Sequence, residues 1–253
     1  MRTPLRLLTF IAGCLAAVGI ASAQTRPEIY DIWKVTLGMK AGEIPDEFIE
    51  HACGTHGGPP SLKLAGFTDF MKCKPEANGL REVYFRYDDE YEYWARANEL
   101  ELETQLFSGT RLFDYPVIMS LLFDEDGAVR GVRVITDPRV GDAERGRREF
   151  WTMANFVKIR FGPDNWNCRD LPKEEGESPA GSYFIKERCE KRLDGDLYLY
   201  ERRYYHKKGQ TFIDPHSGGI NTEAYVSSTW FELLDEGIEP VPTATQQPAR
   251  REG

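Results

Sequence analysis

The sequence predicts an α+β fold of two tandem modules, each made of a helix, an antiparallel sheet and one disulfide. Two loops bounded by cysteines, 53–73 and 168–189, share one plan: a Gly/Pro-rich middle followed by an apolar run. A helix-like pattern precedes each loop, and strand-like patterns follow it. Gly66 and Gly181 lie 115 residues apart, and Cys73 and Cys189 lie 116 apart, so a duplication requires one inserted residue between them.

Residues 1–23 have the layout of a cleaved secretory signal. Arg2 and Arg6 precede the apolar run LLTFIAGCLAAVGIA, which ends in Ala-Ser-Ala before Gln24. The alternative is a lipobox at 11–14 that would leave Cys14 lipidated. No other apolar run reaches the roughly 20 residues that a membrane span needs. We therefore expect an exported protein, periplasmic or secreted, that does not span a membrane.

Four cysteines follow the signal, and their even number in an oxidising compartment predicts two bridges. Of three connectivities we choose Cys53–Cys73 and Cys168–Cys189, because each closes a short loop of the same design. On the chain-entropy model, a loop of this length stabilises the fold by roughly 3 kcal/mol. The alternative is a zinc site with His51 or His56, although the thiols lack the close CxxC spacing.

The first predicted module covers 24–138. Pro45 can begin a helix whose apolar face runs from Ile44 to Ala52, and Gly54 follows as a stop. The run 66–73 reads as a strand and leads to an alternating strand over 80–87. The segments 116–123 and 128–136 flank a turn at 124–127 and predict a hairpin. That turn has some carboxylates of a calcium loop but not its later ligands. Residues 88–115 fit a helix and a continued strand equally.

The second predicted module covers 139–237. Asp142 is a candidate N-cap for a helix that Gly162-Pro163 ends. The bridged loop leads to strands over 182–189, 196–205 and 224–234. Since a helix and a sheet each have one apolar face, each would cover the other. The Pro-rich tail 238–253 is expected to be disordered.

The stretch VTLGMKAGEIPDEFIEHACG resembles the start of the helix in the BamE (SmpA/OmlA) family of envelope lipoproteins. Gly38, Met39 and the apolar positions after them carry this resemblance. The tandem arrangement is also similar, in architecture alone, to the secreted beta-lactamase inhibitor protein. Both resemblances imply a protein that binds other proteins through an exposed sheet face and is not an enzyme.

The sequence contains no GxSxG, phosphate loop, HExxH or CxxCH motif, and we expect no cofactor and no metal. Asp214 and His216 form the best catalytic-looking pair, because an Asp can orient a nearby imidazole. A structural Asp-Pro turn is the favoured interpretation.

Charge separates the two halves. The full chain carries −9, and loss of Arg2 and Arg6 with the signal leaves −11, which argues against nucleic acid as a partner. Residues 82–103 carry −6, whereas 186–208 carry +3. Tyrosines and a tryptophan, typical of protein interfaces, are interleaved with these charges. The candidate partner-binding residues are Tyr84, Tyr91, Tyr93, Trp94, Tyr198, Tyr200, Tyr204 and Tyr205.

Three hypotheses follow. The leading one is a non-enzymatic exported protein that binds or modulates another envelope or secreted protein. The alternatives are a small periplasmic hydrolase that uses Asp214 and His216, and a sensor of a ligand or metal.

Overall fold

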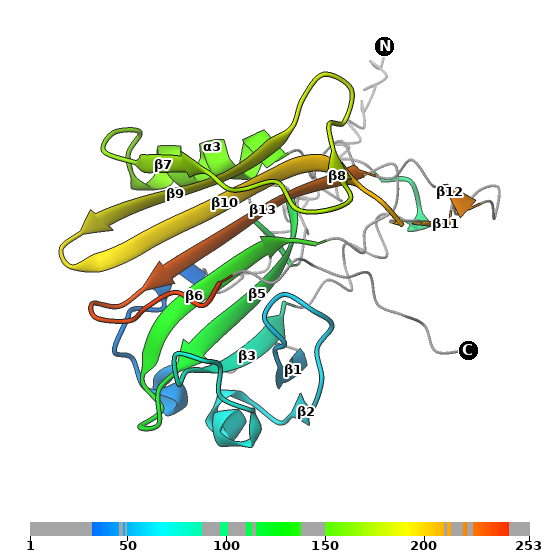
Figure 1. Ribbon diagram of the computed structural model, residues 1–253. Helices are drawn as coiled ribbons and strands as arrows, with labels where there is room; N and C mark the ends of the chain where they lie inside the picture. Colours follow the sequence, from blue (N-terminus) through cyan, green and yellow to red (C-terminus); the bar gives the residue numbers. More distant parts are fainter. Residues whose placement is uncertain are drawn as a thin grey trace, which may run out of the picture.

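A computed structural model describes residues 32–45, 48, 50–87, 97–100, 110–112, 115–137, 150–209, 212–213, 220–221 and 225–242. Eleven strands join in one antiparallel sheet, and a separate pair of short strands lies beside it (Figure 1). The chain is therefore mostly β, and the predicted α+β fold of two helix-plus-sheet modules is wrong. The strands that would have ended each module, one from each half, pair with each other, so the two halves share a single sheet.

The first half of the sheet is a meander with short edge strands. Its strands are β1 (Glu50–Cys53), β2 (Lys63–Leu64), β3 (Arg81–Arg86), β4 (Arg111–Leu112), β5 (Tyr115–Phe123) and β6 (Val129–Thr136). The second half repeats the meander and carries the short strand β8 beside β10. Its strands are β7 (Asn167–Asp170), β8 (Glu177–Ser178), β9 (Ile185–Leu193), β10 (Asp196–Lys207) and β13 (Tyr225–Leu234). The separate pair is β11 (Phe212–Ile213) and β12 (Ile220–Asn221).

The order across the sheet is β2-β1-β3-β5-β6-β13-β10-β9-β7, and β6 and β13 meet at the centre. Each half therefore runs from an outer edge to the middle. Whether the halves arose by duplication stays a prediction.

The hairpin that the sequence predicts over 116–136 is present, and a second hairpin joins two of the strands expected in the other half. Strands β5 and β6 pair around the turn at 124–127, where Gly127 has φ 73° and the Asp124 carboxylate accepts the Ala128 N–H at 2.9 Å. Strands β9 and β10 pair from Asp196–Leu193 to Tyr204–Ile185. Alternating apolar residues beside a turn signal are enough to fix such local pairs.

Two local predictions are wrong. The segment expected to be a helix over 44–52 ends in β1, where His51, Ala52 and Cys53 are all buried. A strand buried on both faces has no alternation that separates it from a helix. The run expected to be a strand before Cys73 is instead the 3₁₀ helix η3 (Phe67–Lys72). Its rings Phe67 and Phe70 stand three residues apart and both pack on the core, as the three-residue period of this helix requires.

One face of the sheet, here called the helix face, carries the larger core. It includes Phe85, Met119, Val134, Tyr200 and Phe231. The face is covered by η3, the 3₁₀ helix η1 (Ile32–Lys34), the 3₁₀ helix η2 (Ala41–Glu43) and helix α3 (Phe150–Phe161). Helix α3 is the only helix of seven or more residues in the described chain, and it lies behind β9 and β10 in Figure 1.

The opposite face, here called the loop face, carries a smaller apolar cluster. Its members include Tyr84, Ile118, Ile135, Leu199 and Trp230. The segment 238–242, here called the strap, follows β13 and crosses over β6 (Figure 1). Ile238 packs on this cluster.

The strap belongs to the tail that the sequence predicts to be disordered. Side chains of the first half bind its carbonyl groups, since Asn78 Nδ2 donates to Glu239 O at 3.1 Å and His56 Nε2 lies 2.9 Å from Pro242 O. Composition alone could not reveal these contacts, because the groups that bind the strap lie more than 150 residues away in the sequence. For 238–242 the structure thus shows specific contacts, whereas residues 243–253 lie outside the described residues and their disorder stays a prediction.

Both predicted disulfides are confirmed. Cys53 and Cys73 join β1 to the end of η3, and Cys168 joins its neighbour Cys189 across β7 and β9. The described residues contain no helix of the length and apolarity required to cross a membrane.

Candidate functional site

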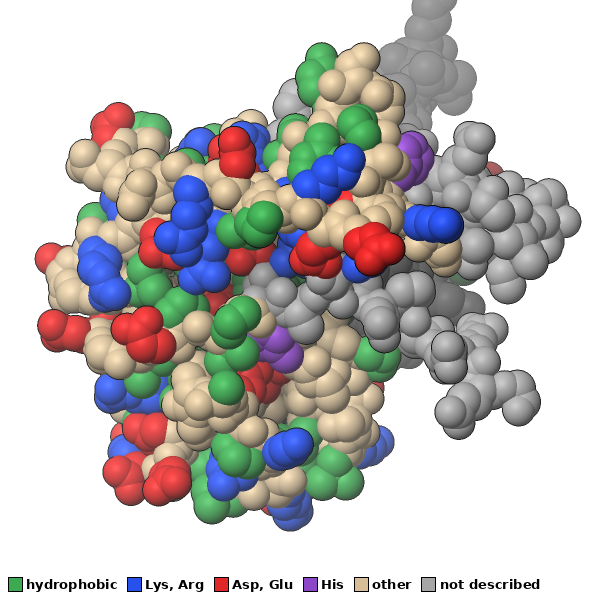
Figure 2. All heavy atoms as spheres, viewed as in Figure 1, with side chains coloured by type: hydrophobic (Ala, Val, Ile, Leu, Met, Phe, Trp, Pro, Cys, Tyr) green, Lys and Arg blue, Asp and Glu red, His purple; other side chains and the backbone are tan. Residues whose placement is uncertain are grey.

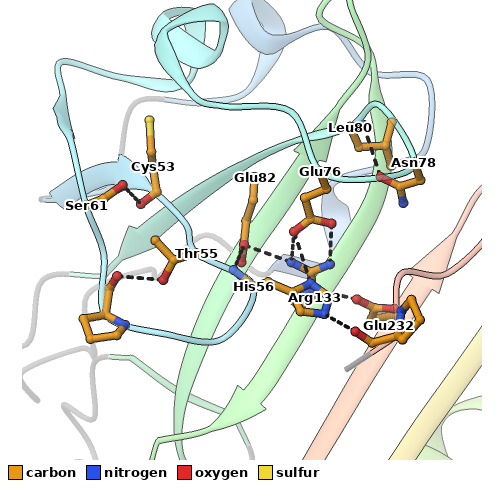
Figure 3. A network of polar contacts seen from close by, with 12 residues as sticks. Cys53, Thr55, His56, Ser61, Glu76, Asn78, Leu80, Glu82, Arg133 and Glu232 are labelled. Atoms are coloured by element: carbon orange, nitrogen blue, oxygen red, sulfur yellow. Dashed lines mark hydrogen bonds and ion pairs between the residues drawn. The ribbon is translucent and has the colours of Figure 1, made fainter. Parts of the chain in front are cut away.

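The most unusual group in the described chain is a buried cluster around Arg133, here called the Arg133 cluster (Figure 3). It contains Arg133, Glu76, Glu82, Glu232 and His56. Arg133 stands on β6 at the centre of the sheet, and its side chain is 1% exposed. Cross-strand register positions Glu232 directly opposite on β13.

Three carboxylates surround the guanidinium group. Glu76 binds it in a bidentate manner, from Oε1 to Nη1 at 2.7 Å and from Oε2 to Nη2 at 3.0 Å. Glu82 Oε2 lies 2.9 Å from Nη1, and Arg133 Nε donates to Glu232 Oε1 at 2.6 Å. One cation thus faces three anions, which leaves a formal excess of two negative charges in a buried place.

His56 is the other basic group of the cluster, and it adds a positive charge when its ring is doubly protonated. Its Nδ1 lies 3.2 Å from Glu76 Oε1, and its backbone N–H donates to Glu82 Oε2 at 2.7 Å. Burial alone would lower the pKa of His56. The hydrogen bond and the charge of Glu76, together with the Pro242 carbonyl, outweigh burial and the nearby Arg133, so this pKa is raised above 6.5.

The charged forms of Glu76 and Arg133 stabilise each other. Burial alone would raise the pKa of Glu76, but hydrogen bonds from His56 and Arg133 lower it to about 2. Burial would likewise lower the pKa of Arg133, yet the charges of Glu82 and Glu232 raise it well above its usual range.

Trp230 on β13 forms one wall of the cluster. Its ring lies 5.1 Å from the Arg133 guanidinium and 4.9 Å from the His56 ring. The side chain is 5% exposed, and its indole Nε1 is buried without a hydrogen-bond partner among the described residues.

Glycines bring the loop of the first disulfide close to this wall. A Cβ on Gly57 would lie 2.5 Å from the Trp230 ring, and a Cβ on Gly54 would overlap the Glu82 side chain. His56 and Gly57 both have positive φ, 53° and 82°, which turns the loop towards the sheet. The Gly-rich sequence between Cys53 and Pro59 is therefore needed for this close approach.

The cluster is poorly suited to acid–base catalysis. A general base works best with a pKa near the operating pH, whereas the pKa of Glu76 is about 2. Four N–H···O contacts to carboxylates already occupy Arg133, so it is not open to an anionic substrate. The arrangement is instead suited to joining β3, β6, β13, the His56 loop and the strap.

A second charged group, here called the β9–β10 ladder, lies on the same face in the other half. Lys186 Nζ binds Glu177 at 3.1 Å, and Arg203 Nη2 binds Glu201 at 2.8 Å. Arg188 lies 3.4 Å from Glu201 as well. Burial raises the pKa of Tyr205, which lies beside Lys186. Cations and anions alternate in this ladder, unlike in the Arg133 cluster.

The predicted partner-binding residues divide into three groups. Tyr84, Tyr200 and Tyr205 are buried, so these side chains cannot touch a partner in this conformation. Tyr198 and Tyr204 are half-buried. The side chains of Tyr91, Tyr93 and Trp94 lie outside the described residues, as do those of Asp214 and His216 and the residues 1–23 with Cys14.

The histidines of the first loop are not brought together. His51 is buried on the helix face against the rings of Phe48 and Phe67, whereas His56 points to the loop face. Among the described residues, metal-type donors gather at Cys168, Glu187 and Cys189, but these two cysteines form a disulfide and offer no thiolate.

The Arg133 cluster was not predicted from the sequence. Its signal is a charged residue at an inward position of three predicted strands: Glu82, Arg133 and Glu232. Glu82 was counted among the charges of an exposed sheet face, and Arg133 and Glu232 were not singled out. Since all three are buried, their mutual pairing could have been inferred only with the strand order known.

No protein-family model, curated protein or solved structure matches the chain. The resemblance to BamE-type proteins therefore stays a prediction.

Proposed function

We propose that this is an exported, non-enzymatic protein that binds an extended segment of another envelope or secreted protein along the β7 edge of its sheet. Two disulfides support an oxidising compartment. The locked charges of the Arg133 cluster support a role other than catalysis.

The open edge at β7 carries the proposal. Strand β7 is the last in the order, and no further strand lies beside it in the described chain. All four of its residues are exposed, and the Arg169 side chain is 62% exposed. Such an edge presents unpaired backbone groups to which a peptide can add as another strand.

The register shows which backbone groups point outwards. Leu171 N donates to Lys186 O at 2.7 Å, so Leu171–Lys186 is a hydrogen-bonded pair. Pairs alternate along an antiparallel ladder, so Asp170–Glu187 and Cys168–Cys189 are non-hydrogen-bonded pairs. The N–H and C=O groups of Cys168 and Asp170 therefore face away from β9.

The opposite edge is less suitable, because β2 has only two residues and follows Pro59 and Pro60. Figure 2 shows hydrophobic side chains on the loop face in small groups separated by charged and polar ones. These features favour backbone recognition at β7 over a large apolar contact on that face.

The test uses the chain from Gln24 onwards as bait in envelope extracts, with two substitutions at one outward position. Asp170→Pro removes the outward N–H without removing a bond to β9, whereas Asp170→Ala keeps that N–H. We expect the wild-type chain and Asp170→Ala to retain the same specific protein and Asp170→Pro to lose it. Retention by all three chains, or by none in repeated trials, contradicts the proposal.

A further inference from the structure

The His56 ring lies between two hydrogen-bond acceptors. Nδ1 is 3.2 Å from the Glu76 carboxylate, and Nε2 is 2.9 Å from the Pro242 carbonyl in the strap. A neutral imidazole has one N–H and one bare nitrogen, so it can donate to only one of these oxygens. Only the doubly protonated ring satisfies both contacts.

We propose that the strap is a pH-controlled latch, closed over the loop face while His56 is doubly protonated and released when His56 loses one proton. The latch lies over β6, which is four strands away from β7 in the order of the sheet, and does not depend on the proposed function at that edge.

Charge decides which contact survives deprotonation. The hydrogen bond to Glu76 joins the ring to a carboxylate, and such charge-assisted bonds are the stronger ones. The remaining proton therefore stays on Nδ1. The bare Nε2 then faces the Pro242 carbonyl oxygen, and these two acceptors repel each other.

The groups around His56 favour the protonated ring. The carboxylates are Glu76 from the loop before β3, Glu82 from β3 and Glu232 from β13, and the opposing cation is Arg133 from β6. The strap contributes a carbonyl group. One positive charge on His56 reduces the excess negative charge of the cluster from two to one.

Within the described part of the chain, few other contacts hold the strap. They are the hydrogen bond from Asn78 to the Glu239 carbonyl, the Ile238 N–H donated to Asp235 O at 3.1 Å and the packing of Ile238. Loss of the Pro242 contact therefore removes a large share of its attachment. Release would uncover His56 and the Trp230 wall.

The linkage between proton binding at His56 and closure of the strap gives the direction and the size of the pH effect. A proton that binds more tightly in the closed state favours closure at low pH, and this preference is lost as pH rises through the pKa of His56. The closing equilibrium should fall tenfold for each pKa unit by which His56 in the closed state exceeds His56 in the released state.

The first experiment measures this reciprocity by NMR titration of the histidine rings. It compares the chain from Gln24 to Gly253 with a chain that ends at Gly237 and lacks the strap. We expect His56 to titrate above pH 6.5 in the longer chain and at a lower pH without the strap. Equal titration in both chains overturns the latch, and so does a neutral His56 in the longer chain below pH 6.5.

The second experiment follows hydrogen exchange of the strap amides from pH 5.5 to 8.5, corrected for the intrinsic exchange rate. Protection should fall as pH rises in the wild-type chain, and His56→Gln should abolish this dependence. His206→Gln is the matched control, because His206 lies on β10 beside Tyr225, and it should preserve the dependence. The proposal is contradicted if the protection of the strap amides in the wild-type chain does not change with pH. It is also contradicted if His56→Gln shows the same pH dependence as the wild type.

Discussion

The two halves of the sheet handle buried charge differently. The Arg133 cluster has one arginine against three carboxylates, and it needs a protonated histidine to reduce the excess. The β9–β10 ladder pairs Lys186 with Glu177 and Arg203 with Glu201, so charges there are matched close to one to one. Both groups lie on the loop face of the same sheet.

The difference shows that the ratio of cations to anions in a buried group determines how strongly it responds to the loss of one charge. In a ladder with matched charges, removal of one side chain leaves its partner with another ion pair. Glu201, for example, still has Arg188 nearby if Arg203 is removed. The Arg133 cluster has one shared cation, so every carboxylate in it depends on the same side chain. In the latch proposed above, the imbalance also makes the Arg133 cluster sensitive to the protonation of His56.

Removal of the shared cation should have the largest effect. Arg133→Met leaves three buried carboxylates without their partner, and loss of one partner of a buried ion pair costs about 3–5 kcal/mol. We expect a decrease of that size in the free energy of unfolding measured in urea.

Two matched variants sharpen this result. Arg130→Met lies on the same strand, but its pair with Asp235 is partly exposed and should contribute about 0–1 kcal/mol. Arg203→Met in the ladder should fall between the two, because Arg188 remains beside Glu201. If the losses of unfolding free energy in Arg133→Met and Arg130→Met differ by less than about 1 kcal/mol, the Arg133 cluster does not stabilise the centre of the sheet as we predict.

The disulfides extend the comparison. Each closes a loop of similar length, with sequence separations of 20 and 21, so Cys-to-Ala replacement of either pair should cost roughly 3 kcal/mol. Cys53 and Cys73 are both buried in the core of the helix face, whereas Cys168 is exposed on β7. Mild reduction followed by alkylation should therefore label Cys168 and Cys189 first. Preferential labelling of Cys53 would contradict this order.

The sequence was sufficient where structure is local. Both disulfides and the hairpin β5–β6 were predicted from short loops and alternating residues near turns, whereas β9 and β10 were predicted as strands without their pairing. The pairing of β6 with β13 was not predictable, because their partners lie about 100 residues apart and either strand could end a separate sheet. That single pairing turns two expected modules into one sheet.

The site was harder to predict than the fold. His56 was considered for a metal, and no sequence signal connected it to Pro242, 186 residues away. Glu82 was counted as part of an acidic surface, although Gly54 and His56 pack over it. Burial of a charged residue depends on partners from other strands, so local patterns do not determine it.

Acid should weaken the Arg133 cluster through Glu76. The pKa of Glu76 is about 2 in the folded chain and 4.5 without its partners, so its ionised form stabilises the fold above pH 4.5. This contribution, on the order of 3 kcal/mol, should be lost as pH falls from 4.5 towards 2. Unfolding free energies of the wild type and Glu76→Gln should therefore converge over this range. A constant gap between them would rule out Glu76 as the acid-sensitive group.

The smallest effect tests how closely the His56 loop must approach the sheet. Gly57 and Gly38 have nearly the same backbone, φ 82° and 86°, so alanine at either position has a similar backbone strain. A Cβ at Gly57 would meet the Trp230 ring at 2.5 Å, whereas a Cβ at Gly38 has nothing within 4 Å. Gly57→Ala should therefore cost about 1–3 kcal/mol more than Gly38→Ala in urea unfolding, because the loop or Trp230 must shift. The same shift would move His56 from Glu76 and lower its pKa towards 6.5, which histidine NMR can measure. Equal stabilities and an unchanged His56 titration would mean that the loop can retreat without disturbing the cluster, and that close packing against Trp230 is not what keeps His56 in position.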